Sequence, residues 1–119
     1  MITNIVLVGF GGALGAILRF LINEIFYKLT INEFPLSTLL INIIGCFFIG
    51  LVAGFSFPYK DSIYYFFIIG FLGSFTTMSA FTHQVLLMLN SNSIYAVSYI
   101  ILTIVLTILA TYIGASISR

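Results

Sequence analysis

The chain has 119 residues, of which 61% are hydrophobic and 6% are charged, and its formal net charge is +1 at pH 7. Soluble domains carry roughly 25% charged residues, so this composition excludes a water-soluble globular protein, and the small net charge implies no nucleic-acid partner. Four apolar stretches, over about 5–27, 35–57, 63–89 and 94–117, each reach the length of about 20 residues that a bilayer span requires. Because the linkers are short, the sequence predicts an all-α membrane protein, a single four-helix transmembrane domain over residues 1–119.

The first stretch contains the string GGALGAILRF. Its Gly11 and Gly15 form a GxxxG pattern, which predicts that another helix approaches closely at this point. Arg19 follows about two-thirds along the stretch. Its charge can reach the lipid headgroups along its aliphatic stem, or it can stand at a pore mouth and concentrate anions. The sequence leaves both interpretations open.

The second stretch begins PLSTLLINIIGCFFIG. Thr38 and Asn42 are four residues apart and therefore share one helix face. A carboxamide inside a membrane is costly without partners, so Asn42 either holds two helices together or donates to a permeating anion, and both alternatives stay open. Cys46 is the sole cysteine, which argues against a disulfide or a zinc site and predicts a small buried residue.

The third stretch holds the unusual segment GFLGSFTTMSAFTHQ. Gly70 and Gly73 weaken a helix, and five hydroxyl-bearing residues follow them, namely Ser74, Thr76, Thr77, Ser79 and Thr82. We expect the helix to be broken mid-membrane, where freed carbonyls can coordinate a cation. The alternative is a kinked helix whose hydroxyls bond back to their own backbone. We expect a structural or interfacial role for His83, which has no acidic or cysteine neighbours.

The fourth stretch carries polar residues at a regular spacing of four, namely Tyr99, Thr103, Thr107 and Thr111. This spacing places them on one face of a helix that is otherwise rich in Ile, Leu and Val. The stripe predicts either a track for a polar solute or a polar seam between two helices.

The acidic residues Glu24, Glu33 and Asp61 all lie at the ends of stretches or in linkers. A proton-coupled cation transporter needs an ionisable acid inside the membrane, and an enzyme needs a nucleophile with a base, so neither class is favoured. Hydroxyl and amide donors can replace the hydration shell of a small anion without a fixed charge that traps it. The edges of phenyl rings carry the positive end of the ring quadrupole and can also face an anion.

Over nearly its whole length the chain resembles the Fluc (CrcB) fluoride channel family. The resemblance rests on GGALGAILRF, PLSTLLINIIGCFFIG and GFLGSFTTMSAF, the last of which is similar to the family pattern GFxGGFTTFSTF. It implies a multi-pass protein of the cell (plasma) membrane that exports toxic fluoride by passive permeation. It also implies an antiparallel, dual-topology dimer with two pores.

The resemblance further implies roles for single residues. Arg19 matches the arginine near the vestibule, and the backbone carbonyls of Gly73 and Thr76 match those that hold a structural sodium ion at the dimer centre. The expected anion pore comprises Asn42, Phe81, Met78, Thr38, Ser79, Tyr99, Thr103, Thr107 and Thr111.

Three residues depart from the family pattern. Met78 replaces the first of two pore phenylalanines, Ala80 a hydroxyl residue and Gln84 a glutamate. A thioether cannot offer a phenyl edge, so the resemblance implies either a homodimer with altered pores or a heterodimer with a second family member.

Lysine and arginine residues set membrane orientation, and here they are nearly balanced. Lys60 and Arg119 fall on one side of the membrane and Lys28 on the other. This weak bias permits insertion in both orientations, or a weak preference for the orientation with the N-terminus inside. Two alternatives to a channel remain: a small dual-topology multidrug exporter, which would need a carboxylate where this chain has Arg19, and a non-conducting membrane partner subunit.

Overall fold

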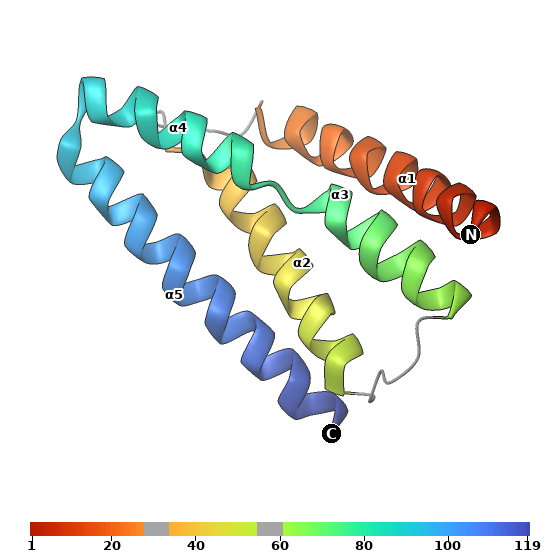
Figure 1. Ribbon diagram of the computed structural model, residues 1–119. Coiled ribbons are helices and arrows are strands. Elements are labelled where there is room, and N and C mark those ends of the chain that lie inside the picture. Colours follow the sequence, from red (N-terminus) through yellow and green to blue (C-terminus); the bar gives the residue numbers. More distant parts are fainter. Residues whose placement is uncertain (28–33, 55–60) are drawn as a thin grey trace.

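The computed structural model describes residues 1–27, 34–54 and 61–119. It is all-helical, and Figure 1 shows the helices in chain order. The described elements are α1 (Ile2–Tyr27), α2 (Leu36–Gly54), a π-helix η1 (Tyr64–Leu72), α3 (Gly73–Phe75), α4 (Met78–Ser91) and α5 (Ser93–Ser118).

Four helical segments are long and apolar enough to cross a membrane: Ile2–Tyr27, Leu36–Gly54, Tyr64–Ser91 and Ser93–Ser118. The four spans predicted from hydropathy are therefore confirmed, and the chain is a multi-pass membrane protein. The last three residues of the predicted second span lie outside the described part of the chain, as do the linker charges Lys28, Glu33 and Lys60. The π-helical form of η1 was not predicted.

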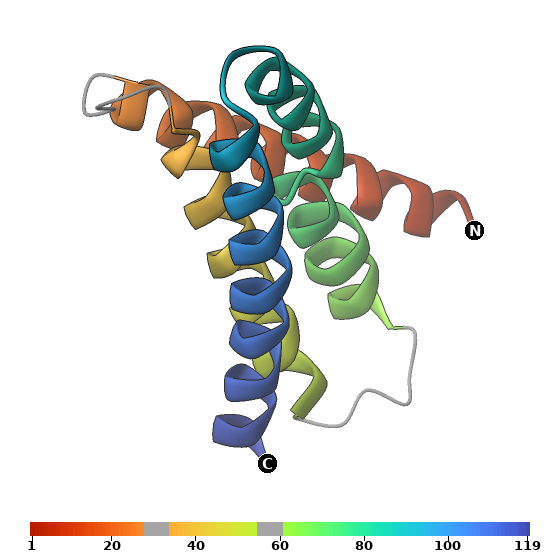
Figure 2. The ribbon, with the colours of Figure 1, turned by 90° about the vertical axis from the view of Figure 1, so that its left-hand side faces the viewer.

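The helices associate in two pairs (Figures 1 and 2). Helix α2 makes its most extensive contacts with α5, and α1 makes its own with η1 and α3. Helix α4 packs against α5, with which it shares the short turn at Asn92. The third span therefore contacts both pairs, because its first half lies on α1 and its second half on α5.

The pair α1–η1 is held together by close backbone approach at glycines. A Cβ on Gly11 would lie 2.1 Å from the Phe66 carbonyl oxygen, and one on Gly15 would lie 2.2 Å from that of Phe71. No side chain fits at these distances, so the close approach predicted from the GxxxG pattern is confirmed. Gly114 of α5 makes a similar approach to the backbone of α2 at Phe47.

Little of the molecule is buried. A cluster of buried apolar residues comprises Leu39, Met88, Ala96 and Tyr99, all within the α2, α4 and α5 group. Four further apolar residues are buried, namely Ile41, Leu72, Phe75 and Ala110. Most other large apolar side chains are exposed on the helix surfaces, which is the arrangement that lipid contact allows. Thr38, Asn42 and Thr103 are polar and nevertheless buried, although burying a polar group costs free energy unless it has a hydrogen-bond partner.

Candidate functional site

The third span is interrupted at two threonines. Helix α3 ends at Phe75 and α4 begins at Met78, and Thr76 and Thr77 between them have extended backbone, with ψ of 155° and 116°. The hydroxyl of Thr77 accepts a hydrogen bond from the Ala80 amide at 3.2 Å and so caps α4. Threonine is a favoured residue for such a cap, which explains why a new helix begins here.

The carboxamide of Asn42 on α2 binds the backbone at this interruption. Its Nδ2 donates to the Thr77 carbonyl at 3.2 Å, and its Oδ1 accepts from the Thr77 amide at 2.8 Å. Asn42 therefore holds two helices together, which is one of the two roles that the sequence left open. A carboxamide has two N–H donors, so the second remains for another acceptor.

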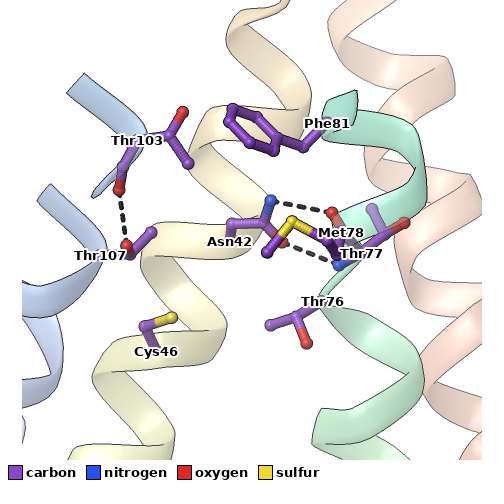
Figure 3. Close-up of a pocket in the computed structure, with 8 residues that line it drawn as sticks. All are labelled: Asn42, Cys46, Thr76, Thr77, Met78, Phe81, Thr103 and Thr107. Carbon is purple, nitrogen blue, oxygen red and sulfur yellow. Dashed lines mark hydrogen bonds between the residues drawn. The ribbon is translucent and has the colours of Figure 1, made fainter. Parts of the chain in front are cut away.

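A cavity of about 210 Å³ surrounds this carboxamide (Figure 3). It lies between α2, the interruption and the start of α4, and α5. None of its lining residues carries a charge, and most of its polar groups are neutral donors. The lining residues are Asn42, Cys46, Thr76, Thr77, Met78, Phe81, Thr103 and Thr107.

The hydroxyls of the predicted stripe on α5 differ in their bonding. Thr107 donates to the Thr103 carbonyl of its own helix, and Thr111 donates to the carbonyls of Thr107 and, across the interface, of Cys46. Thr103 is 8% exposed, and its Oγ1 has no hydrogen-bond partner among the described residues. Other atoms of Thr103 line the cavity, and a rotation of the side chain about χ1 would turn this hydroxyl into it.

The remaining residue of the stripe, Tyr99, belongs to a separate hydrogen-bond network. Its hydroxyl donates to Gln84 Oε1 at 2.8 Å, and Gln84 Nε2 donates to the Thr38 hydroxyl at 2.9 Å. This chain of bonds joins α5, α4 and α2. Tyr99 is fully buried and Thr38 is 3% exposed, so Gln84 satisfies two hydroxyls that water cannot reach.

Phe81 and Met78, which the resemblance places at the two pore phenylalanine positions, differ in their surroundings. The ring of Phe81 lies 5.1 Å from that of Tyr99, at 57° to it. Met78 is 71% exposed and is therefore free to change rotamer. Figure 3 shows Phe81 and Met78 on the same side of the cavity as the start of α4.

A second cavity, of about 150 Å³, adjoins the first at Thr76 and Cys46, which line both. Its other lining residues are Gly45, Ile49, Ile68, Leu72 and Gly73. In a regular helix the carbonyls of Gly73 and Thr76 would accept from the amides four residues later, those of Thr77 and Ala80. These two amides instead bond to Asn42 Oδ1 and Thr77 Oγ1, which frees both carbonyls from their usual helical donors.

The structure thus gathers Asn42, Met78, Phe81, Thr103 and Thr107 around one cavity and places the other predicted pore residues elsewhere. Thr38 and Tyr99 lie in the buried Gln84 network, Thr111 bonds to the α2 backbone, and Ser79 is exposed beside Thr77.

Arg19 is half-buried on α1. Its Nε is buried without a hydrogen-bond partner in the described part of the chain.

Sequence reasoning missed two residues here. Cys46 was expected to be merely buried, but it is partly exposed and lines both cavities. Its position one turn after Asn42 was the available signal. Gln84 was noted only as a departure from a family pattern. Its partners Tyr99 and Thr38 lie 15 and 46 positions away in the sequence, and no sequence pattern indicates bonds over such separations.

Comparison with known proteins shows the family to which the chain is similar. The family described as CrcB-like protein, Camphor Resistance (CrcB), matches residues 6–115. The protein of Campylobacter lari named fluoride-specific ion channel FluC is 43% identical over 119 residues, which cover 96% of each chain. That of Campylobacter fetus, with the same name, is 42% identical over 94% of this chain and 91% of its own. Fluoride-specific ion channel FluC 1 of Methanosarcina acetivorans is 35% identical over 93% and 87% respectively.

Proposed function

This chain belongs to the CrcB-like family, and on that premise we propose that it is a fluoride-selective ion channel rather than an enzyme. Relatives that match it over nearly their full length are named fluoride-specific ion channels. Fluoride would leave the cell by passing down its own concentration gradient, and this export would need no other energy source.

One observation in the structure carries this proposal: the cavity beside α5 combines unused hydrogen-bond donors with an absence of charge. Asn42 has a second N–H, and the buried Thr103 hydroxyl has no partner. An amide and a hydroxyl are both uncharged at neutral pH. They can therefore bind an anion through hydrogen bonds without a fixed positive charge that would trap it.

These donors suit a small, strongly hydrated anion. Entering an apolar surrounding costs an ion its hydration shell, and donors in the wall must replace it. The amide of Asn42 and the hydroxyl of Thr103 can each supply one bond, and the ring edge of Phe81 carries the positive end of its quadrupole. Fluoride is compact enough to approach several such groups at once within the cavity.

The guanidinium of Arg19 lies on a different helix and does not line this cavity. We assign it to the vestibule, where a positive charge raises the local concentration of anions.

We propose that the working unit is an antiparallel dimer of chains inserted in both orientations, with the interruption of the third span at mid-membrane. Broken helices are tolerated at that depth only where protein or water covers them. A second chain would provide the cover on the open face beside Gly73, where little besides the Ile68 carbonyl approaches.

A structural sodium ion at the centre of such a dimer fits the residues present. Hard cations take oxygen ligands, and the carbonyls of Gly73 and Thr76 are free of their usual helical donors. These two carbonyls would hold the ion, and the ion would neutralise the dipoles that converge there. The melting temperature of the purified dimer should then fall when sodium is replaced by a large organic cation.

Met78 bears on whether both chains of the dimer are identical. Two relatives carry the numbered names FluC 1 and FluC 3, which fits a chain that occurs beside a second family member. We propose that this chain forms at least one subunit of the channel, and that Met78 occupies the wall position of an expected phenylalanine.

Reconstitution of the purified protein into liposomes loaded with fluoride tests the proposal. A fluoride electrode should record efflux well above that of empty liposomes. Efflux that requires co-reconstitution of a second family member would identify a heterodimer, and no efflux in either case would contradict the proposal.

The Phe81→Ile and Asn42→Ala variants separate a channel from a non-conducting partner. In a channel these changes lower flux while the dimer survives, whereas in a partner subunit assembly suffers. A multidrug exporter is not favoured, because the described spans hold no mid-span carboxylate. Binding of a lipophilic cation by the purified protein would be the result that revives it.

A further inference from the structure

Both residues at the interruption of the third span are held by α2, from positions three residues apart on one helix face. Asn42 bonds the backbone of Thr77. Gly45, which is buried, faces the side chain of Thr76, because a Cβ built on Gly45 would lie 2.2 Å from the Thr76 Cγ2 methyl. Carbon atoms in contact are about 3.5–4.0 Å apart. The Thr76 methyl therefore occupies the space that a side chain at position 45 would fill.

The Thr76 side chain is held at a second point by its hydroxyl. Thr76 Oγ1 donates to the carbonyl of Leu72, the last residue of η1, at 3.0 Å, and the Thr76 amide donates to the same oxygen at 3.1 Å. A β-branched side chain has few χ1 rotamers, and rotation away from this one would break the bond from Oγ1 to Leu72. The methyl on Gly45 and the hydroxyl on Leu72 thus fix how Thr76 sits against α2.

The carbonyl of Thr76 belongs to the peptide group that Asn42 holds. This group also contains the Thr77 amide, and in a planar trans peptide the C=O and N–H bonds point in opposite directions. The Thr77 amide donates to Asn42 Oδ1 at 2.8 Å, so the Thr76 carbonyl points away from the Asn42 carboxamide. Thr76, Gly45 and Gly73 all line the second cavity, of about 150 Å³. Gly45 and Asn42 therefore act on one peptide group, Gly45 through the Thr76 side chain and Asn42 through the Thr77 amide.

We propose that Gly45 is a positioning residue for the cation site, because it admits the Thr76 methyl and so fixes, together with Asn42, the direction of the Thr76 carbonyl. Thr76 has extended backbone and lies between two helices, so helical bonds do not determine that direction. The packing part of this proposal stands by itself, whereas the cation part rests on the structural sodium ion proposed above. A purely structural role for Gly45 would change stability and leave sodium binding as it is.

A methyl group moved from position 76 to position 45 tests the packing part. Gly45→Ala adds a methyl that overlaps Thr76, and Thr76→Ser removes the Cγ2 methyl but keeps the hydroxyl that bonds Leu72. In the double variant the new Cβ takes the place of the lost methyl. Phe75, whose Cδ2 would lie 3.3 Å from that Cβ, needs to shift by only a few tenths of an ångström. Thr76→Val is the matched control, since it loses the hydroxyl and keeps a methyl where Cγ2 stands.

Melting temperatures of the purified protein in detergent give the first readout. Gly45→Ala should melt below wild type, and the double variant with Thr76→Ser should recover most of the loss. The double variant with Thr76→Val should recover none of it. If Gly45→Ala does not fold, folding of the double variant with Thr76→Ser is itself the recovery. Lack of recovery with Thr76→Ser, or equal recovery with Thr76→Val, would overturn the contact.

The sodium dependence of melting gives the second readout, with a large organic cation in exchange so that the ionic strength stays constant. Sodium should raise the melting temperature of wild type, because an ion that binds only the folded state stabilises it. Loss of an outer-shell partner of a metal site costs about 10- to 100-fold in affinity, so Gly45→Ala should need at least about tenfold more sodium for half of this rise. Thr76→Ser alone should weaken the response by less, and the double variant should respond as wild type does.

Gly54→Ala is the matched control for lost stability, because its Cβ would meet Ser118 at the last residue of α2. It should melt below wild type and keep the wild-type sodium response. An unchanged response in Gly45→Ala, or an equally weakened one in Gly54→Ala, would overturn the positioning role. If Gly45→Ala does not fold, a response in Thr76→Ser at least as strong as in the double variant would overturn it. No sodium effect on wild type would refute the sodium site and the cation part with it, and the recovery experiment would still decide the contact.

Discussion

The carboxamide of Asn42 bonds both backbone groups of Thr77, donating to its carbonyl at 3.2 Å and accepting from its amide at 2.8 Å. The Asn42 side chain, from the second span, thereby replaces the helical hydrogen-bond partners that the Thr77 backbone lacks at the interruption of the third span. The same bonds leave one N–H of Asn42 for the adjoining cavity. Support of the fold and provision of a donor are therefore combined in one residue.

Substitution of Asn42 should affect stability and flux to different extents. Asn42→Ala leaves the Thr77 amide and carbonyl without partners, which should cost about 1–3 kcal/mol of unfolding free energy and abolish fluoride flux. Asn42→Asp keeps an acceptor for the Thr77 amide, but it loses both N–H donors and buries a carboxylate beside the Thr77 carbonyl, so flux should be lost and stability should fall at least as far as in Asn42→Ala. Thermal melting in detergent and liposome efflux measure the two effects. Wild-type flux in Asn42→Asp would show that the amide donor is dispensable.

Substitution of Thr103, whose hydroxyl has no partner, should lower flux without lowering stability, in contrast to substitution of Asn42. Thr103→Val removes a buried polar group that has no partner, so the melting temperature should stay the same or rise, because burying such a group is unfavourable. Fluoride flux should nevertheless fall. Thr107→Val is the matched control, since its hydroxyl already donates to its own helix, and flux should fall less. A larger loss of flux in Thr107→Val than in Thr103→Val would contradict the assignment.

These two threonines also show what a sequence pattern can and cannot reveal. The spacing of Tyr99, Thr103, Thr107 and Thr111 predicts one face of a helix, and Thr103 and Thr107 do line the same cavity. The spacing does not say which hydroxyls bond to their own backbone. That depends on neighbouring helices, so only the structure distinguishes the free Thr103 from its bonded neighbours.

The Gln84 network should behave as a coupled unit. Gln84→Leu leaves the hydroxyls of Tyr99 and Thr38 buried without their partner, which should cost about 1–3 kcal/mol for each group. Tyr99→Phe removes one of these hydroxyls, so the double variant should lose less than the sum of the two single losses. A coupling free energy of about 0.5–3 kcal/mol is expected for such contacts, measured by melting in detergent. Strict additivity would show that the bond between Tyr99 and Gln84 contributes nothing.

The glycine contact between α1 and η1 should be sensitive to a single methyl group. In Gly15→Ala the new Cβ would meet the Phe71 carbonyl oxygen at 2.2 Å, so the helices must separate and stability should fall. Gly9→Ala is the matched control because nothing lies within 4 Å of its Cβ position. It should be neutral or stabilise by about 0.5–1 kcal/mol through helix propensity. Equal melting temperatures for the two variants would contradict the contact.

The four spans were predictable because length and hydropathy alone determine which segments can cross a bilayer. The contact at Gly11 and Gly15 was predictable because small residues four apart leave room for a second backbone. The π-helical form of Tyr64–Leu72 was not predictable, since it depends on how the chain fits against α1. The role of Cys46 in the cavity wall depends on where α4 begins, which the bonds from Asn42 to Thr77 fix.

The central claim is that this chain forms a path for fluoride that excludes chloride. Its most direct test loads liposomes containing the purified protein, alone or with a second family member, with equal fluoride and chloride. A potassium gradient with valinomycin then drives both anions outward, and two electrodes follow them in the same sample. The account predicts rapid release of fluoride while chloride stays at the level of empty liposomes. Release of both anions at similar rates, or retention of fluoride, would contradict it.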